Sequence, residues 1–131
     1  MKPAVLVVED NRDNTTLLAW ALEEAGYDYR TVETAEEGLA LLEQQPFDMV
    51  LMDISLPGMD GKEATRRLRA DPKFADLPII AVTAHAIAEE EEAIMACGVN
   101  EIMTKPVHVG NLLDAIAGYV NAVDLPVGQA L

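Results

Sequence analysis

The sequence alternates short apolar runs with longer segments in which apolar residues recur at helical spacing. The runs cover residues 4–8, 29–32, 49–52, 79–82 and 101–103, of which 29–32 is the least apolar. Continuous apolar runs of this length are typical of strands buried on both faces of a parallel sheet. Strands that alternate with helices predict βα units with right-handed crossovers and helices on both faces of the sheet.

The intervening segments carry helix start and stop signals. They cover residues 11–25, 34–45, 62–70, 87–97 and 108–120. Gly26 and Gly98 stand where helix C-termini favour glycine, and Thr34 with Glu37 has the spacing of a capping box. We therefore expect an α/β, flavodoxin-like (βα)5 doubly wound fold with a five-stranded parallel sheet in the order 2-1-3-4-5. Residues 1–120 would form one domain, and residues 121–131 a short C-terminal tail without an effector domain.

Polar residues follow four of the predicted strands. Glu9 and Asp10 follow the first, Asp53 the third, Thr83 the fourth and Lys105 the fifth. Ligands of doubly wound sheets bind at the carboxyl ends of the strands, at the switch point in the strand order, which here lies between strands 1 and 3. Each residue has a plainer interpretation, since a Glu-Asp pair or a threonine can cap a helix and a Lys-Pro pair can form a turn. Their shared place at the strand ends favours one site.

The chemistry of these residues suits a metal ion and a phosphoryl group. Three neighbouring carboxylates repel one another unless a cation joins them, and Mg²⁺ prefers oxygen ligands. A carboxylate nucleophile, a metal, an ammonium and a hydroxyl are the groups that phosphoryl transfer to a carboxylate needs. Asp53 would be the reactive residue.

Four stretches of the chain resemble the receiver domain of two-component response regulators, and the resemblance extends over about residues 3–120. The stretches are Val7-Val8-Glu9-Asp10-Asn11, Met52-Asp53-Ile54-Ser55-Leu56-Pro57-Gly58-Met59-Asp60-Gly61, Val82-Thr83-Ala84 and Thr104-Lys105-Pro106. The resemblance implies that Asp53 accepts a phosphoryl group from a sensor histidine kinase or a histidine phosphotransfer protein. It implies an Mg²⁺ or Mn²⁺ ion held by Glu9, Asp10, Asp53 and the main-chain carbonyl of Ser55. It also implies phosphoryl binding and switching by Thr83, Ala84 and Lys105, and a cis peptide between Lys105 and Pro106.

Three positions vary within such a family. Ile102 stands where many receivers carry Tyr or Phe, so switching through an aromatic rotamer is not expected here. The side chains of Ser55 and His85 would flank the path of an attacking water and would set the phosphoryl lifetime. A solvent-exposed place at the start of a helix is the plainer interpretation of His85.

The charge balance narrows the partners. The chain has 23 acids, 9 bases and a formal net charge of −14, which disfavours nucleic acid and anionic membranes. No apolar run reaches the roughly 18 residues of a membrane span, and no signal-peptide pattern is present, so we expect a cytoplasmic protein. Its single cysteine, Cys97, rules out an internal disulfide, and the arginines 66, 67 and 69 are expected to balance local acid.

Together these observations predict a stand-alone response regulator that signals by a phosphorylation-dependent protein interaction, not an enzyme acting on outside substrates. Its output face would comprise residues 87–97, 101–103 and 108–120, and it would be a monomer or a weak dimer. An intermediate of a phosphorelay, passing phosphate to a second histidine, would use the same site. An Mg-dependent aspartyl phosphatase is less consistent with the sequence, because Ser55 stands where such enzymes usually carry a second aspartate.

Overall fold

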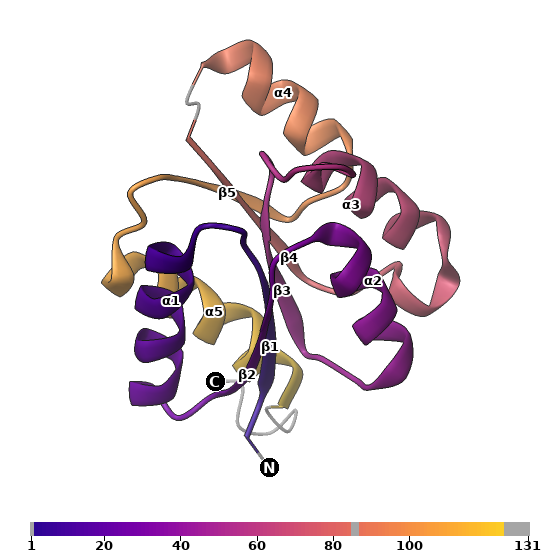
Figure 1. The fold of residues 1–131 in the computed structure, drawn as a ribbon. Helices are drawn as coiled ribbons and strands as arrows, with labels where there is room; N and C mark the ends of the chain where they lie inside the picture. The colour runs from indigo at the N-terminus through magenta and orange to yellow at the C-terminus, as the bar shows by residue number, and fades with distance from the viewer. Residues whose placement is uncertain (1, 85–86, 125–131) are drawn as a thin grey trace.

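The computed structural model describes residues 2–84 and 87–124 of the chain. Its strands and helices alternate along the sequence (Figure 1). The strands are β1 (Ala4–Val8), β2 (Asp28–Val32), β3 (Met49–Asp53), β4 (Ile79–Thr83) and β5 (Glu101–Thr104). The helices are α1 (Arg12–Glu24), α2 (Ala35–Gln44), α3 (Gly61–Ala70), α4 (Ala88–Ala96) and α5 (Val109–Asp124), and a single 3-10 turn, η1, spans Pro72–Phe74.

The five strands form one parallel sheet in the order β2-β1-β3-β4-β5, which confirms the predicted flavodoxin-like topology. β1 and β3 are adjacent although α1, β2 and α2 separate them in the chain, and Val8 pairs with Met52 at their carboxyl ends. The loops after these two strands therefore leave the sheet side by side, at the switch point of the strand order.

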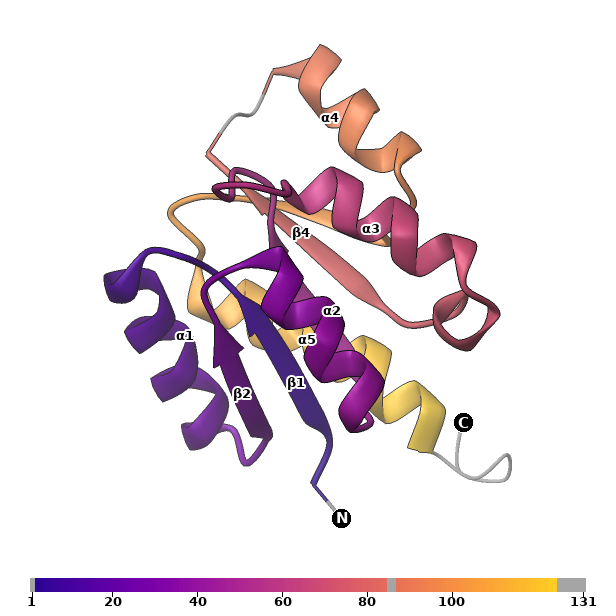
Figure 2. The same ribbon diagram turned by 45° about the vertical axis from the view of Figure 1, so that its right-hand side comes forward.

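Helices cover both faces of the sheet. α1 and α5 lie on one face, and α2, α3 and α4 lie on the other (Figures 1 and 2). Successive residues of a strand point to opposite faces, so Leu6 and Val8 pack in one core while Val5 and Val7 pack in the other. All four are at most 1% exposed, which explains why β1 reads as a continuous apolar run and not as an alternating one.

Some element boundaries differ from the expected ones. α5 continues to Asp124, so the segment expected to be a tail from residue 121 begins as helix. Residues 121–124 contain neither Gly nor Pro, and without such a breaker the helix has no reason to end at Val120. Asp53 and Thr83 are the last residues of β3 and β4 and do not lie beyond them. No helix in the described ranges is long and apolar enough to cross a bilayer.

Arg69, in the last turn of α3, connects this helix with three other segments of the chain. Its guanidinium donates hydrogen bonds to the carbonyl of Gly98 at 2.8 Å, the carbonyl of Phe74 at 2.8 Å and Oδ1 of Asn100 at 2.9 Å. The same Oδ1 of Asn100 accepts the backbone N–H of Ile79 at 2.8 Å. Arg69 thus ties α3 to η1, to the α4–β5 loop and to the start of β4, a role different from the expected balance of local acid.

Candidate phosphoryl and metal site

Four strands bring the predicted site residues to one edge of the sheet. Glu9 and Asp10 follow β1, Asp53 ends β3, Thr83 ends β4 and Lys105 follows β5. Because all the strands are parallel, their carboxyl ends share this edge, and the loops there carry the polar side chains.

Three carboxylates converge at the centre of this edge. One carboxylate oxygen from each of Glu9, Asp10 and Asp53 lies within 4.8 Å of the other two. Glu9 and Asp53 are buried, each with 2% of its surface exposed, while Asp10 is exposed. Two buried acids and one exposed acid thus bring their carboxylate oxygens together, with Asp10 on the solvent side.

Lys105 supplies the positive charge of the site. Its Nζ lies 3.1 Å from Oδ2 of Asp53 and 3.1 Å from Oε1 of Glu9, so one ammonium bridges both buried carboxylates. The Lys105–Pro106 peptide is cis, as expected. A buried ion pair is retained only where further hydrogen bonds satisfy its members, and here the backbone N–H groups of Asn11 and Ser55 bond Glu9 and Asp53.

The surroundings shift two pKa values in the site. Burial raises the pKa of Glu9, and the hydrogen bond and negative charge of Asp53 raise it further, against the weaker effects of the Asn11 N–H and Lys105. Burial by itself would lower the pKa of Lys105, but its hydrogen bonds to Asp53 and Glu9 prevail, so this pKa is raised. The ammonium of Lys105 therefore stays charged, but its single positive charge does not balance the three acids of the site.

The residues present fit a hard divalent cation. They offer carboxylate oxygens from two buried acids and one exposed acid, the ligand type that Mg²⁺ and Mn²⁺ prefer. Burial and the neighbouring Asp53 raise the pKa of Glu9 because they disfavour its ionised form. A divalent cation bound beside Glu9 would oppose this effect and favour the ionised form.

The loop after Asp53 is held by contacts that the sequence did not reveal. The N–H of Ser55 donates to Oδ1 of Asp53 at 3.0 Å. A Cβ placed on Gly61 would lie 2.3 Å from the backbone oxygen of Asp53, so only glycine permits this approach of α3 to the end of β3. The buried hydroxyl of Thr65 donates to the carbonyl of Gly61 at 2.8 Å and fixes the first turn of α3. From the sequence, Gly61 could be recognised only as the last residue of a loop. Its close approach to the backbone of Asp53 could not be predicted from that position.

The remaining predicted residues lie around the site with different exposure. Thr83 is fully buried at the end of β4 and pairs with Thr104 of β5, whereas Ala84 is exposed. Ser55 is exposed, and Ile102 is half-buried in β5. The predicted role of His85 falls on a residue outside the described ranges.

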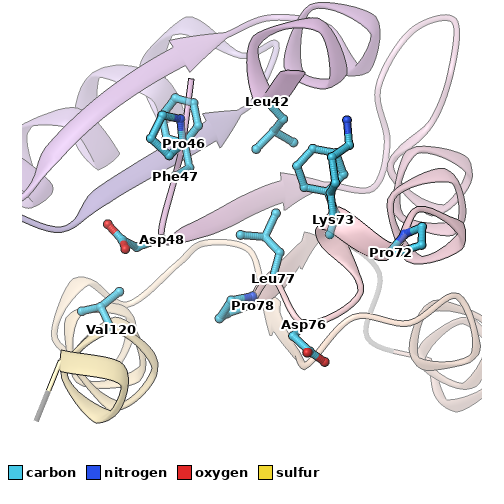
Figure 3. A pocket seen from close by; sticks show the side chains of 11 residues that line it. Leu42, Pro46, Phe47, Asp48, Pro72, Lys73, Asp76, Leu77, Pro78 and Val120 are labelled. Carbon is cyan, nitrogen blue, oxygen red and sulfur yellow. The ribbon is translucent and has the colours of Figure 1, made fainter. Parts of the chain in front are cut away.

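A separate apolar pocket lies at the opposite end of the sheet. Its volume is about 470 Å³, and Phe47, Asp48, Leu77 and Pro78, which precede β3 and β4, form part of its wall. Leu42 and Leu77 point into it, and Val120 of α5 lies at its side (Figure 3). None of the predicted site residues lines this pocket, so it is separate from the candidate site at the carboxyl edge of the sheet.

Comparison with known proteins identifies the family to which the chain is similar. A sequence model of the response regulator receiver domain matches residues 5–117. The sensor protein GacS of Pseudomonas syringae pv. syringae is 38% identical over 117 residues, which cover 87% of this chain, and the chain spans only 13% of the length of GacS. The polar-differentiation response regulator DivK of Brucella ovis is 35% identical over 120 residues, 92% of this chain and 98% of DivK.

Solved structures agree with these relatives. The receiver domain of the sensor histidine kinase PA1611 from Pseudomonas aeruginosa PAO1, with a magnesium ion in its active-site cleft, superposes with a TM-score of 0.86. It is 32% identical, and the match covers 92% of this chain and 99% of that one. A receiver protein from Pseudomonas putida, also 32% identical, gives a TM-score of 0.84 over 90% and 98% of the two chains. With the family match over most of its length, this chain belongs to the response regulator receiver domain family.

Proposed function

We propose that this chain accepts a phosphoryl group on Asp53 from a phosphohistidine of a sensor kinase or a phosphotransfer protein, and signals through a phosphorylation-dependent protein contact. The observation that carries this proposal is the set of residues that surrounds the Asp53 carboxylate. It is buried at the end of β3, beside two further acids, and Lys105 contacts one of its oxygens. Receiver domains are signalling domains, and the residues here supply the groups that such a transfer needs.

The proposed transfer exchanges one bond at phosphorus for another, with Asp53 as the incoming group. One carboxylate oxygen attacks phosphorus, the new O–P bond forms as the P–N bond to the donor histidine breaks, and the electron pair goes to the imidazole nitrogen. Lys105 orients Asp53 before the attack and would bind a phosphoryl oxygen afterwards. The Ser55 N–H keeps Oδ1 in place.

The metal would be held by Glu9, Asp10, Asp53 and the main-chain carbonyl of Ser55. Mg²⁺ or Mn²⁺ bound there would neutralise part of the negative charge that gathers when phosphate meets carboxylate. Thr83 would donate its hydroxyl to the phosphoryl group, and the small side chain of Ala84 would leave the approach open. The side chains of Ser55 and His85 would modulate hydrolysis.

Mass spectrometry after incubation with acetyl phosphate and Mg²⁺ tests the chemistry. We expect one phosphoryl adduct on the wild-type chain and none on Asp53→Asn. An adduct that persists in Asp53→Asn would place the acceptor elsewhere, and a wild-type chain that remains unmodified with every donor would refute the proposal. Steady turnover of an unrelated phosphomonoester would instead support the phosphatase interpretation.

A relay role is a second candidate, because this chain is similar to part of the sensor protein GacS and to the receiver domain of the sensor histidine kinase PA1611. The two roles differ in where the phosphoryl group goes next. Transfer from phosphorylated Asp53 to a purified phosphotransfer protein would favour the relay. Hydrolysis alone would favour a terminal response regulator.

A further inference from the structure

Within the described residues, the C-terminal part of the molecule from 87 to 120 presents little positive charge at its surface. Residues 87–120 contain six acids and a single lysine or arginine, Lys105, and that ammonium bonds Glu9 and Asp53 inside the site. Lys62 of α3 pairs with Glu90 at 3.4 Å, and the hydroxyl of Tyr119 donates to Glu101 at 2.9 Å. Within the described residues, Glu91, Glu92 and Asp114 have no ion-pair partner.

Two of these acids line an apolar groove between α4 and β5. The groove has a volume of about 760 Å³, and its lining consists of the apolar residues Ala88, Met95, Ala96 and Ile102 and the acids Glu91 and Glu92. Met95 is 46% exposed, and Ile87, which precedes α4, is 64% exposed. An exposed apolar side chain is informative where it lines a groove with other apolar residues, as Met95 does with Ile102.

A second groove lies on the other side of β5. It has a volume of about 550 Å³, and its lining includes Ile102, His108, Asn111 and Asp114. β5 is the last strand of the sheet and pairs only with β4, so Ile102 stands between the two grooves on an open strand edge. β3 and β4 are buried throughout, whereas no residue of β5 is.

We propose that these two grooves, the acidic docking face, bind a segment of a partner protein in which Lys or Arg residues flank an apolar side chain. The inference rests on the proposed function and specifies the partner of its output surface. The apolar side chain would pack between Met95 and Ile102, and the basic ones would reach Glu91, Glu92 and Asp114. Complementary charge of this kind speeds association and rejects partners of the wrong sign.

Charge argues against the other occupants. A second copy of this chain would bring the same acids face to face, and each copy carries a formal net charge of −14. Nucleic acid would meet the same repulsion. A basic segment is the occupant whose charge the face complements.

Fluorescence anisotropy with short labelled peptides tests the proposal. The probe is a peptide with Lys and Arg around a central Leu-Phe pair, compared with a version in which Glu replaces every base and one in which Ser replaces Leu and Phe. With the full chain, phosphorylated by acetyl phosphate and Mg²⁺, we expect the basic apolar peptide to bind at least about tenfold more tightly than either comparison peptide at an ionic strength of about 0.15 M.

A matched pair of variants locates the site. Glu91→Gln/Glu92→Gln should weaken binding of the basic peptide about fivefold, whereas Asp13→Asn/Glu24→Gln, the same charge change on α1, should change it less than about twofold. Equal losses in both variants would mean a general field and would overturn the docking face. Equal binding of basic and acidic peptides would also overturn it.

Mass spectrometry of the same samples separates the two levels of the argument. An adduct on Asp53 without preference for the basic peptide would refute the docking face alone. A missing adduct would refute the proposed function, while the charge preference of the unmodified chain would still be measured.

Discussion

Gly61→Ala tests whether the close approach of α3 to β3 sets the position of Asp53. The added Cβ would lie 2.3 Å from the Asp53 carbonyl oxygen, 2.9 Å from the Ile54 Cα and 3.0 Å from the Asp53 carbonyl carbon. Non-bonded atoms prefer separations of about 3.5–4.0 Å, so the backbone must move by about 1 Å. All three neighbours are backbone atoms, which cannot rotate away as a side chain can.

The expected cost follows from this displacement. Overpacking of a well-packed site costs about 1–3 kcal/mol, and the better helix propensity of Ala recovers at most about 1 kcal/mol of it. We therefore expect Gly61→Ala to lower the free energy of unfolding by about 1–2 kcal/mol. A shift of about 1 Å at a reacting group can cost up to about 100-fold in rate, so phosphorylation by acetyl phosphate should slow at least tenfold.

Gly118→Ala is the matched control, because nothing lies within 4 Å of a Cβ placed on this residue of α5. It should raise the free energy of unfolding by up to about 1 kcal/mol and leave the phosphorylation rate unchanged. Urea unfolding followed by circular dichroism gives the stabilities, and mass spectrometry over time gives the rates. If Gly61→Ala matches Gly118→Ala in both measurements, the contact does not position Asp53 and the reasoning fails.

Three further predictions concern other parts of the molecule. Arg69→Lys should lower the free energy of unfolding by about 1–3 kcal/mol in urea titrations, because Lys cannot bond three separated acceptors, whereas the exposed Arg66→Lys should change it by at most about 0.5 kcal/mol. Mg²⁺ at about 100-fold above its Kd should stabilise the wild-type chain by about 2.7 kcal/mol in thermal melts, and Asp10→Asn should lose most of this gain. Ile102→Tyr should change peptide binding more than the phosphorylation rate, and equal effects on both would contradict a role at the surface.

The fold was predictable from sequence largely because three of its strands, β1, β3 and β4, are buried on both faces. Burial on both faces makes each of these three strands a continuous apolar run, and glycines such as Gly26, with φ of 86°, end helices between strands. Parallel strands place every following loop at one edge, so the convergence of Glu9, Asp10, Asp53 and Lys105 followed from topology.

Other features depend on distances that no local pattern contains. Lys105 bonds Glu9 as well as Asp53, and the contact with Glu9 joins residues far apart in the chain. The three acceptors of Arg69 lie on segments that only the folded chain brings together. Gly61 is similar, because its importance comes from the backbone of β3 facing it and not from its own conformation.

The location of Lys105 also constrains how the proposed site could report its state. A phosphoryl group adds about −1.5 to −2 charges, and the bound metal and Lys105 would meet that charge inside the site. The acids of the docking face would then carry nearly the same charge before and after phosphorylation. A partner that distinguishes the two states must therefore read shape. β4 and β5 are suited to transmit it, because Thr83 at the site pairs with Thr104, and Ile102 on the same strand lines both grooves. An aliphatic Ile102 has no ring to swing between two orientations, so movement of the strand edge itself would carry the signal.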